Sequence, residues 1–202
     1  MRIQGKTFMI TGGGSGLGEA TARVFAEAGA NVVIADLSEA TGNAVADRLG
    51  ERAVFSNCDV SSEESVTETV KLAIERFDAI HGAVNCAGIG CAQRVTSKDG
   101  PHPLDLFKKV IDINLTGTFN VIRLCAVAMQ QRDADETGAR GVFINTASIA
   151  ACEGQIGQAA YAASKGGVVS MTLPIAREFA RFGIRVVTIV PGLFDTPMLA
   201  AL

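Results

Sequence analysis

The chain of 202 residues predicts an α/β fold, a single doubly wound parallel sheet of the Rossmann type with helices on both faces. Apolar strand-like runs alternate with helical stretches along its whole length. The runs are continuous Val, Ile, Ala and Phe segments without polar alternation, as required when helices cover both faces of a sheet. Right-handed crossovers then favour the strand order 3-2-1-4-5-6.

The elements follow from these apolar runs and from the turn residues between them. Strands are expected at residues 6–11, 31–36, 53–57, 81–86, 140–146 and 184–190. Helices are expected at residues 17–29, 40–49, 62–77, 104–130 and 158–181. Pro174 should kink or shorten the last helix, because proline lacks the backbone donor that a helix needs. With 48% hydrophobic residues, we expect residues 1–202 to form one domain.

The first strand runs directly into a glycine cluster, Gly12-Gly-Gly-Ser-Gly16-Leu-Gly18, and a helix follows. The glycines permit a tight turn and a close approach of the backbone to a pyrophosphate. The free N–H groups and the positive dipole end of the new helix also face an anion there. Strand, glycine turn and helix together predict a dinucleotide-phosphate site.

The second strand ends at Asp36, eighteen residues after Gly18. An acidic group at this place meets the adenosine ribose, because its carboxylate accepts hydrogen bonds from a free 2′-hydroxyl. The same carboxylate would repel the 2′-phosphate of NADP, so NAD is the predicted cofactor. The alternative is a polar residue that begins a turn or caps the next helix.

Ligands of such sheets bind at the carboxyl ends of the strands, so residues just after each strand are candidates for the site. These segments are Cys58-Asp59-Val60, Asn85-Cys86-Ala87-Gly88, Ser148 and Pro191-Gly192-Leu-Phe-Asp-Thr196. The first is placed to contact adenine, and the small residues of the second let a cofactor lie close. Each segment alone is also compatible with ordinary turn chemistry.

Tyr161 and Lys165 stand four residues apart in a predicted helix, which places both on one face, and Ser148 lies thirteen residues upstream. A cation one turn away stabilises a phenolate, so the pair can act as an acid/base unit for proton transfer at an alcohol or a carbonyl. The alternative is that Tyr161 and Lys165 are neighbours on the protein surface by chance.

Composition excludes several other classes of protein. The net charge of −3 and the pI near 5.4, without a run of Lys or Arg, argue against nucleic-acid binding. Five cysteines, an odd number without a C-x-x-C pair, and only two histidines predict reduced thiols and no metal site. We expect no membrane span and no leader sequence, hence a cytoplasmic enzyme, because the chain enters its first strand at once and lacks a run of ~20 apolar residues.

Together these segments resemble the short-chain dehydrogenase/reductase family. The motifs are Thr11-Gly12-x-x-x-Gly16-x-Gly18, Asn85-Cys86-Ala87-Gly88, Asn114, Ser148, Tyr161-x-x-x-Lys165 and Pro191-Gly192. The resemblance implies a NAD(P)-dependent oxidoreductase in which Tyr161 exchanges the proton and Ser148 hydrogen-bonds the reacting oxygen. Lys165 would hold the ribose hydroxyls and stabilise the phenolate, and Asn114 would tie a water into a proton relay. The alternative for Asn114 is a helix-interior polar residue that bonds backbone.

Four further segments are similar to the branch of type 2 short-chain 3-hydroxyacyl-CoA dehydrogenases, which also includes enzymes acting on hydroxysteroids. They are Asn120-Val-Ile-Arg-Leu, Gly154-Gln-Ile-Gly-Gln-Ala-Ala-Tyr161, Thr172-Leu-Pro-Ile-Ala-Arg177 and Pro191-Gly-Leu-Phe194. The resemblance implies a substrate carbonyl near Gln158 and a homotetramer built through residues 104–130 and 158–181. The alternative is that the domain's own sheet covers the apolar faces of these helices. The residues that it places around NAD are Ser15, Leu17, Asp36, Asp59, Val60, Cys86, Phe194 and Thr196.

The predicted reaction is the interconversion of L-3-hydroxyacyl-CoA and 3-ketoacyl-CoA. The alternatives are a steroid or other hydroxy substrate, a 3-ketoacyl reductase, or a NAD-binding subunit without turnover. Members of the family usually continue beyond the sixth strand with a substrate-covering segment and a last strand. We therefore expect residues 185–190 to form an apolar sheet edge, and we treat the sequence as part of a longer enzyme.

Overall fold

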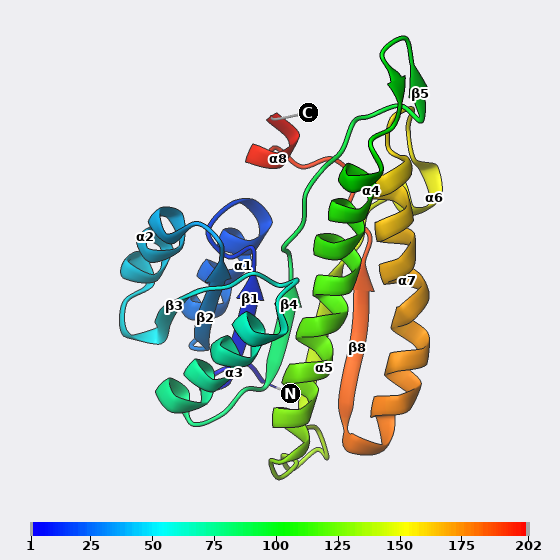
Figure 1. The fold of residues 1–202 in the computed structure, drawn as a ribbon. Helices are drawn as coiled ribbons and strands as arrows, with labels where there is room; N and C mark the ends of the chain where they lie inside the picture. The colour runs from blue at the N-terminus through cyan, green and yellow to red at the C-terminus, as the bar shows by residue number, and fades with distance from the viewer. Residues whose placement is uncertain (1, 201–202) are drawn as a thin grey trace.

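The computed structural model describes residues 2–200 and contains a six-stranded sheet between two layers of helices (Figure 1). All neighbouring strands of this sheet are parallel, in the order β3-β2-β1-β4-β7-β8. The strands are β1 (Thr7–Thr11), β2 (Asn31–Asp36), β3 (Ala53–Asn57), β4 (Gly82–Asn85), β7 (Gly141–Thr146) and β8 (Ile184–Ile189). The predicted strand order 3-2-1-4-5-6 is confirmed, with the numbers shifted by a hairpin of β5 (Thr96–Ser97) and β6 (Gly100–Pro101).

The two faces of the sheet are covered by different helices. The helices are α1 (Gly16–Glu27), α2 (Glu39–Leu49), α3 (Glu63–Phe77), α4 (Leu104–Ile111), α5 (Gly117–Gln130), α6 (Ala150–Glu153), α7 (Ala159–Phe179) and α8 (Pro197–Ala200), with 3-10 turns at Gly50–Arg52 and Ala180–Phe182. One face packs through Met9 and Phe143 against α3, α5 and α7. The other packs through Ile10 and Ile34 against α1 and α2. The alternation of Met9 and Ile10 follows from the two-residue period of a strand.

The strand β8 forms one edge of the sheet within residues 2–200, and Val187, Ile189 and Val190 expose nearly half of their surface. One face of β8 packs against α7, which lies next to it in Figure 1. An apolar edge with unpaired backbone groups is a site at which further chain can pair.

The helix predicted at residues 104–130 is interrupted by one π-helical turn, Asp112–Thr116, which joins α4 to α5. Such turns occur frequently at functional sites, because the extra residue redirects the side chains that follow. By length and composition alone, residues Leu104–Gln130 could cross a membrane, but half of their most apolar window is buried in the protein. A core helix of a globular protein meets the same criteria.

Two features differ from the sequence analysis. Helix α7 continues five residues beyond Pro174, so the expectation of a shortened helix was wrong, and the expected kink stays a prediction. The ring of Pro174 lies exposed while Ile175 and Phe179 are buried in the core, so the packing of this turn compensates for the lost hydrogen bond. The sequence analysis also did not predict the β5–β6 hairpin, α6 or α8, which are too short to carry a periodic pattern.

Candidate active site

The loop between β1 and α1 has a backbone that only glycine allows. Gly12 and Gly16 have φ angles of +64° and +51°, values that favour glycine because it has no Cβ. A Cβ at Gly12 would lie 2.9 Å from the backbone nitrogen of Ala87, and one at Gly18 would collide with the carbonyl oxygen of Gly12. The loop therefore lies directly against the end of β4, with the N-terminus of α1 open to an anion.

Asp36 at the end of β2 braces this loop. Its Oδ2 accepts a hydrogen bond of 2.9 Å from the Gly14 backbone, and its Oδ1 accepts one of 2.9 Å from Ser38. A carboxylate oxygen has two acceptor sites, so each oxygen can accept one further hydrogen bond. Asp36 thus both orders the loop and presents acceptors to the cavity, and the turn-forming alternative describes only part of its role.

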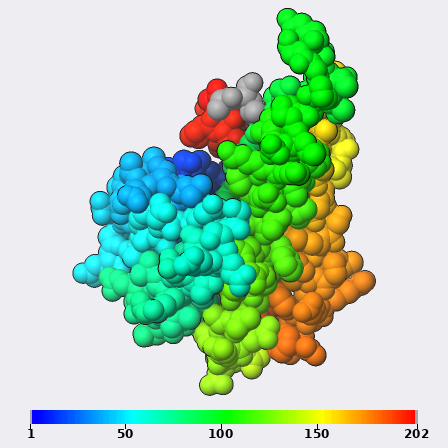
Figure 2. Space-filling model, in the orientation of Figure 1, coloured from blue at the N-terminus to red at the C-terminus, as the bar shows by residue number. Residues whose placement is uncertain are grey.

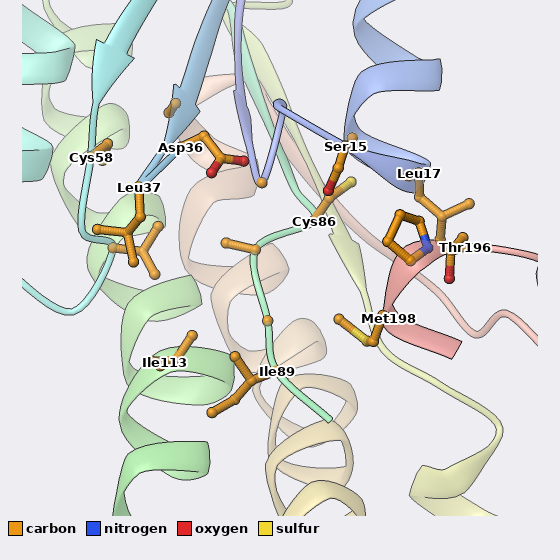
Figure 3. Close-up of a pocket in the computed structure, with 18 of the residues that line it drawn as sticks. Ser15, Leu17, Asp36, Leu37, Cys58, Cys86, Ile89, Ile113, Thr196 and Met198 are labelled. Atoms are coloured by element: carbon orange, nitrogen blue, oxygen red, sulfur yellow. The ribbon is translucent and has the colours of Figure 1, made fainter. Parts of the chain in front are cut away.

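A cavity of about 280 Å³ lies between the glycine loop and the ends of β2, β3 and β4. Figure 2 shows the hollow between the blue and cyan N-terminal half and the green segment, with the red C-terminal segment above it. In Figure 3, Asp36 and Ser15 point toward the cavity, and Ile89, Ile113 and Met198 lie across from them. The predicted cofactor residues that line it are Gly12, Ser15, Gly16, Leu17, Gly18, Asp36, Asp59, Val60, Cys86, Ala87, Gly88 and Thr196.

The loop after β3 is fixed by a side chain from α5. Asn120 is buried, and its Nδ2 donates to the carbonyl oxygens of Val60 at 2.9 Å and Ser62 at 3.2 Å. Asp59 accepts two hydrogen bonds from Ser61 through one carboxylate oxygen. This end of the cavity is therefore held by hydrogen bonds to backbone groups.

Lys165 is the most deeply buried cation of the site, with 6% of its surface exposed. Its Nζ donates to the Thr146 carbonyl at 2.7 Å and lies 5.7 Å from the centre of the Tyr161 ring. Burial lowers the pKa of Lys165 from its usual value to about 8, and the thiol of Cys86 acts weakly in the opposite direction. The cation next to the phenol, expected from the spacing of four residues, is thus present.

A second cavity of about 160 Å³ adjoins the first and contains the acid/base residues. Four residues line both cavities, namely Leu17, Cys86, Thr196 and Met198. The predicted residues that line the second cavity are Cys86, Ser148, Gln158, Tyr161, Lys165, Pro191, Gly192, Phe194 and Thr196. The glycine loop and the phenol of Tyr161 therefore lie at neighbouring cavities.

Ser148 and Gln158 reach the second cavity from loops at the two ends of α6. The Oγ of Ser148 accepts from the Ala150 backbone at 3.2 Å, which leaves its hydroxyl hydrogen for a ligand. The Oε1 of Gln158 accepts from the Gln155 backbone at 2.9 Å, which leaves the amide N–H₂ group for a ligand. Both side chains therefore present donors to this space, as a carbonyl oxygen requires.

Asn114 and Asn85 do not line either cavity. Asn114, in the π-helical turn, accepts from the Ile89 backbone nitrogen at 2.8 Å and donates to the Ile89 carbonyl and to Ser164 Oγ, both at 3.0 Å. Both amide hydrogens are thus engaged, and the backbone-bonding alternative describes this side chain. A relay water would need the backbone of Asn114 or the free acceptor site of Oδ1, so that role stays a prediction.

Asn85 turns into the sheet, where its Nδ2 donates to Asn145 Oδ1 at 2.9 Å. Its own Oδ1 is buried without a partner within the described residues. The sequence analysis placed Asn85 at the cofactor, whereas the residues that follow it, Cys86 to Gly88, line the cavity. Asn85 supports the strand end from which those residues project.

Sequence reasoning missed part of the cavity walls. The additional residues are Ala35, Leu37, Ile89, Ile113, Pro197 and Met198 in the first cavity and Gly90, Cys91, Thr146, Ala147 and Leu199 in the second. Four of them, Ala35, Leu37, Thr146 and Ala147, lie at strand ends, and that position is the signal that could have found them. Ile113 and Met198 carry no such signal, since the π-helical turn and α8 place them.

The comparisons with known proteins agree with this geometry. The family model described as short chain dehydrogenase matches residues 6–202. The chain belongs to the short-chain dehydrogenase/reductase family. Membership confirms the predicted family and makes the chain an oxidoreductase that binds NAD(H), for which the glycine cradle and Asp36 are suited.

Individual relatives and solved structures show which branch of the family the chain is most similar to. The chain is 53% identical to 3-hydroxyacyl-CoA dehydrogenase type-2 from Homo sapiens, with 99% of this chain and 77% of the relative covered. It is 46% identical to the crystal structure of 3-hydroxyacyl-CoA dehydrogenase type-2 from Mycobacterium avium, with a TM-score of 0.92 and coverages of 98% and 79%. The crystal structure of a 3-ketoacyl-(acyl-carrier-protein) reductase from Brucella melitensis, complexed with NADH, matches at 35% identity with a TM-score of 0.87. The match covers 98% of this chain and 80% of the reductase chain.

Proposed function

We propose that this oxidoreductase interconverts L-3-hydroxyacyl-CoA and 3-ketoacyl-CoA with NAD. The observation that carries the proposal is that Ser148, Tyr161 and Lys165 line one cavity, which shares four lining residues with the dinucleotide cavity. Relatives from mammals and an insect, 50% to 53% identical over nearly the whole chain, carry the name 3-hydroxyacyl-CoA dehydrogenase type-2. The named activity and the site therefore support the same reaction class.

In alcohol oxidation, the Tyr161 phenolate takes the proton of the substrate hydroxyl, and Ser148 donates a hydrogen bond to the same oxygen. NAD, when bound, supplies the acceptor for the hydride from carbon. In ketone reduction Tyr161 returns the proton to the oxygen. Lys165 stabilises the phenolate, because its buried Nζ lies 5.7 Å from the ring centre in a region with little water to screen the charge.

Lys165 also has donors left for the cofactor. An ammonium has three N–H groups, and one of them is bound to the Thr146 carbonyl. Lys165 lines the second cavity, which adjoins the dinucleotide cavity, and the other two N–H groups can hold ribose hydroxyls there. Lys165 thereby positions the ribose and the phenol together.

The substrate carbonyl would lie between Ser148, Tyr161 and the free amide of Gln158. The lining of this cavity also includes the apolar side chains of Leu193, Met198 and Leu199. Apolar side chains in the same cavity as three polar donors suit an acyl chain that carries an oxygen near one end. The cavity does not by itself specify the length of the chain.

NAD is favoured over NADP because both oxygens of Asp36 lie at the cavity with free acceptor sites. A 2′-phosphate placed there would face a carboxylate, and no Lys or Arg lines this cavity within the described residues. The preference for NAD over NADP therefore follows from repulsion between the Asp36 carboxylate and the 2′-phosphate.

The test is the formation of NADH from NAD and 3-hydroxybutyryl-CoA, measured by absorbance, with NADP and a hydroxysteroid as parallel arms. The thioester should react fastest, with NAD, and the Tyr161→Phe variant should be nearly inactive while it still binds NAD. A faster rate with the steroid would assign the alternative substrate. No turnover in any arm, together with NAD binding by calorimetry, would contradict the proposal and favour a binding subunit.

Acyl-carrier-protein substrates are a separate arm, because the chain also resembles a 3-ketoacyl-(acyl-carrier-protein) reductase. Equal or higher kcat/KM with the carrier-protein thioester would move the assignment to that reaction. A CoA thioester that outperforms both the carrier-protein thioester and a free hydroxy acid would sharpen the assignment to acyl-CoA.

We further propose that the protein is a cytoplasmic homotetramer that assembles through α5 and α7. The support is a set of large apolar side chains that these two helices expose, namely Phe119, Val127, Val169 and Leu173. Apolar side chains gathered on helices are typical of contacts between subunits. Light scattering should give four times the chain mass, and Phe119→Glu should lower it, whereas a monomeric mass in the unaltered chain would contradict this proposal.

A further inference from the structure

Cys91 and His102 form a thiol–imidazole pair at the wall of the acid/base cavity. The Sγ of Cys91 lies 3.8 Å from Nε2 of His102, and Nδ1 of the same ring lies 2.9 Å from the Pro103 carbonyl oxygen. A carbonyl oxygen can only accept, so Nδ1 carries the hydrogen of that bond. In the neutral ring, the lone pair of Nε2 therefore faces the thiol.

The pair is held in place from both sides. The His102 ring packs edge-on against Phe107, with ring centres 6.3 Å apart, and the backbone nitrogen of His102 donates to the Val95 carbonyl at 2.8 Å. Cys91 is buried in a small apolar cluster with Val110 and Ala160. An oriented base next to a fixed nucleophile is the arrangement that activates cysteine.

Cys91 borders a space that a small carbonyl compound can enter. Cys91 lines the cavity of about 160 Å³ together with Ser148, Gln158 and Tyr161, although only 6% of its surface is exposed. Ser148, Gln158 and Tyr161 can polarise a carbonyl oxygen in this cavity, and Cys91 lines the same cavity. Small electrophiles with a carbonyl group are thus the ligands that fit.

We propose that Cys91 is a covalent modification site for small α,β-unsaturated carbonyl compounds, with His102 as its base. The thiol proton passes to Nε2, and the sulfur forms a bond to the β-carbon. The electron pair of the carbon–carbon double bond moves to the α-carbon, which then takes the proton from Nε2. The single product is a saturated carbonyl compound joined through its β-carbon to Cys91 by a thioether bond, so no oxidant, reductant or leaving group is involved.

The other cysteines lack this combination of base and cavity. Cys152 is exposed and has no histidine partner among the described residues. Burial raises the pKa of Cys58, Cys86 and Cys125, which keeps those thiols protonated. Cys152 therefore provides an internal reference for the reactivity of an ordinary exposed thiol.

The experiment treats the intact chain, without cofactor, with methyl vinyl ketone and follows each cysteine peptide by mass spectrometry over time. Cys91 should react, and His102→Gln should slow Cys91 at least tenfold while the rate at Cys152 stays the same. An unchanged Cys91 rate in His102→Gln, or modification of Cys152 with none at Cys91, would overturn the proposal. The test involves no substrate turnover, so it stands independently of the proposed dehydrogenase reaction.

A second measurement uses only the unaltered protein, in case His102→Gln folds poorly. The ratio of the Cys91 rate to the Cys152 rate is compared in the native chain and in urea. The native ratio should be higher, because unfolding separates Cys91 from its base. A native ratio equal to or below the ratio in urea would show that the fold merely shields Cys91, and the proposal would fail.

Discussion

The loop after β1 and the helix α7 both supply residues to the site, but different physical effects place them. In the loop, Gly12 and Gly16 adopt positive φ angles, and close contacts exclude a Cβ at Gly12 and Gly18. In α7, Tyr161 and Lys165 lie on an ordinary helix, and burial alone gives Lys165 its unusual chemistry. Backbone conformation thus builds the cofactor side, whereas tertiary packing tunes the acid/base side.

The largest expected effect is on the acid/base side. Tyr161→Phe removes the proton donor and should lower kcat by about 10²- to 10⁴-fold, the usual contribution of general acid–base catalysis. The dissociation constant for NAD should change little, because the glycine loop and Asp36 are untouched. Steady-state kinetics and calorimetry measure the two effects separately, and turnover close to that of the unaltered chain would remove Tyr161 from the mechanism.

A substitution in the glycine loop should instead weaken the binding of NAD. Gly12→Ala forces a Cβ to within 2.9 Å of the Ala87 nitrogen at a φ of +64°, so the loop must shift and NAD affinity should fall more than tenfold. Gly5→Ala is the matched control, since Gly5 has a φ of +69° and no atom within 4 Å of the added Cβ. Calorimetry should find normal NAD binding in the control, and equal losses in both variants would mean that backbone strain, not close contact, is the cause.

A smaller effect is expected from charge on the cofactor side. Asp36→Asn keeps a side chain of similar shape and one acceptor oxygen, but it removes the negative charge that faces the 2′ position. The ratio of kcat/KM for NAD to that for NADP should fall about tenfold, the effect of ~1.4 kcal/mol at one position. An unchanged ratio would indicate that other residues discriminate between the cofactors.

The smallest effect concerns stability and pH on the acid/base side. The pKa of Lys165 is lowered to about 8 from 10.5, so between these values the unfolded chain binds more protons than the folded chain. The free energy of unfolding should therefore rise with pH across that window, and Lys165→Met should flatten the rise. Urea titrations at a series of pH values, without cofactor, give the slopes, and identical slopes would contradict the lowered pKa.

The pH dependence of stability that His81 causes can be compared with that of Lys165, because His81 lies outside the two cavities. Burial, with Arg132 and Lys6 nearby, lowers its pKa to about 4 from 6.5, and its Nδ1 accepts from the Thr7 backbone at 3.1 Å. Stability should therefore fall as the pH drops from 6.5 to 4, because only the unfolded chain gains the proton easily. His81→Gln should reduce the loss of stability between pH 6.5 and 4. The same variant should leave the rise in the free energy of unfolding between pH 8 and 10.5, which Lys165 causes, unchanged.

Several features of the site could be predicted because neighbours in sequence determine them. The glycine loop, Asp36 at the strand end and the spacing of Tyr161 and Lys165 all depend on residues within a few positions of one another. Asn85 could not be placed in this way, since its partner Asn145 lies sixty residues away on the adjacent strand. The orientation of Asn114 likewise depends on Ile89, in a separate loop.

The sequence by itself determined the doubly wound sheet, its strand order, the phosphate-binding loop and the candidate acid/base pair, because hydrophobic periodicity, glycine and helical spacing act locally. Only the tertiary structure decided that Lys165 is buried against Thr146, that Thr196 and Met198, just before and within α8, line both cavities, and that Cys91 meets His102. These features depend on the burial of charges and on contacts between segments far apart in the chain, and no local pattern encodes either.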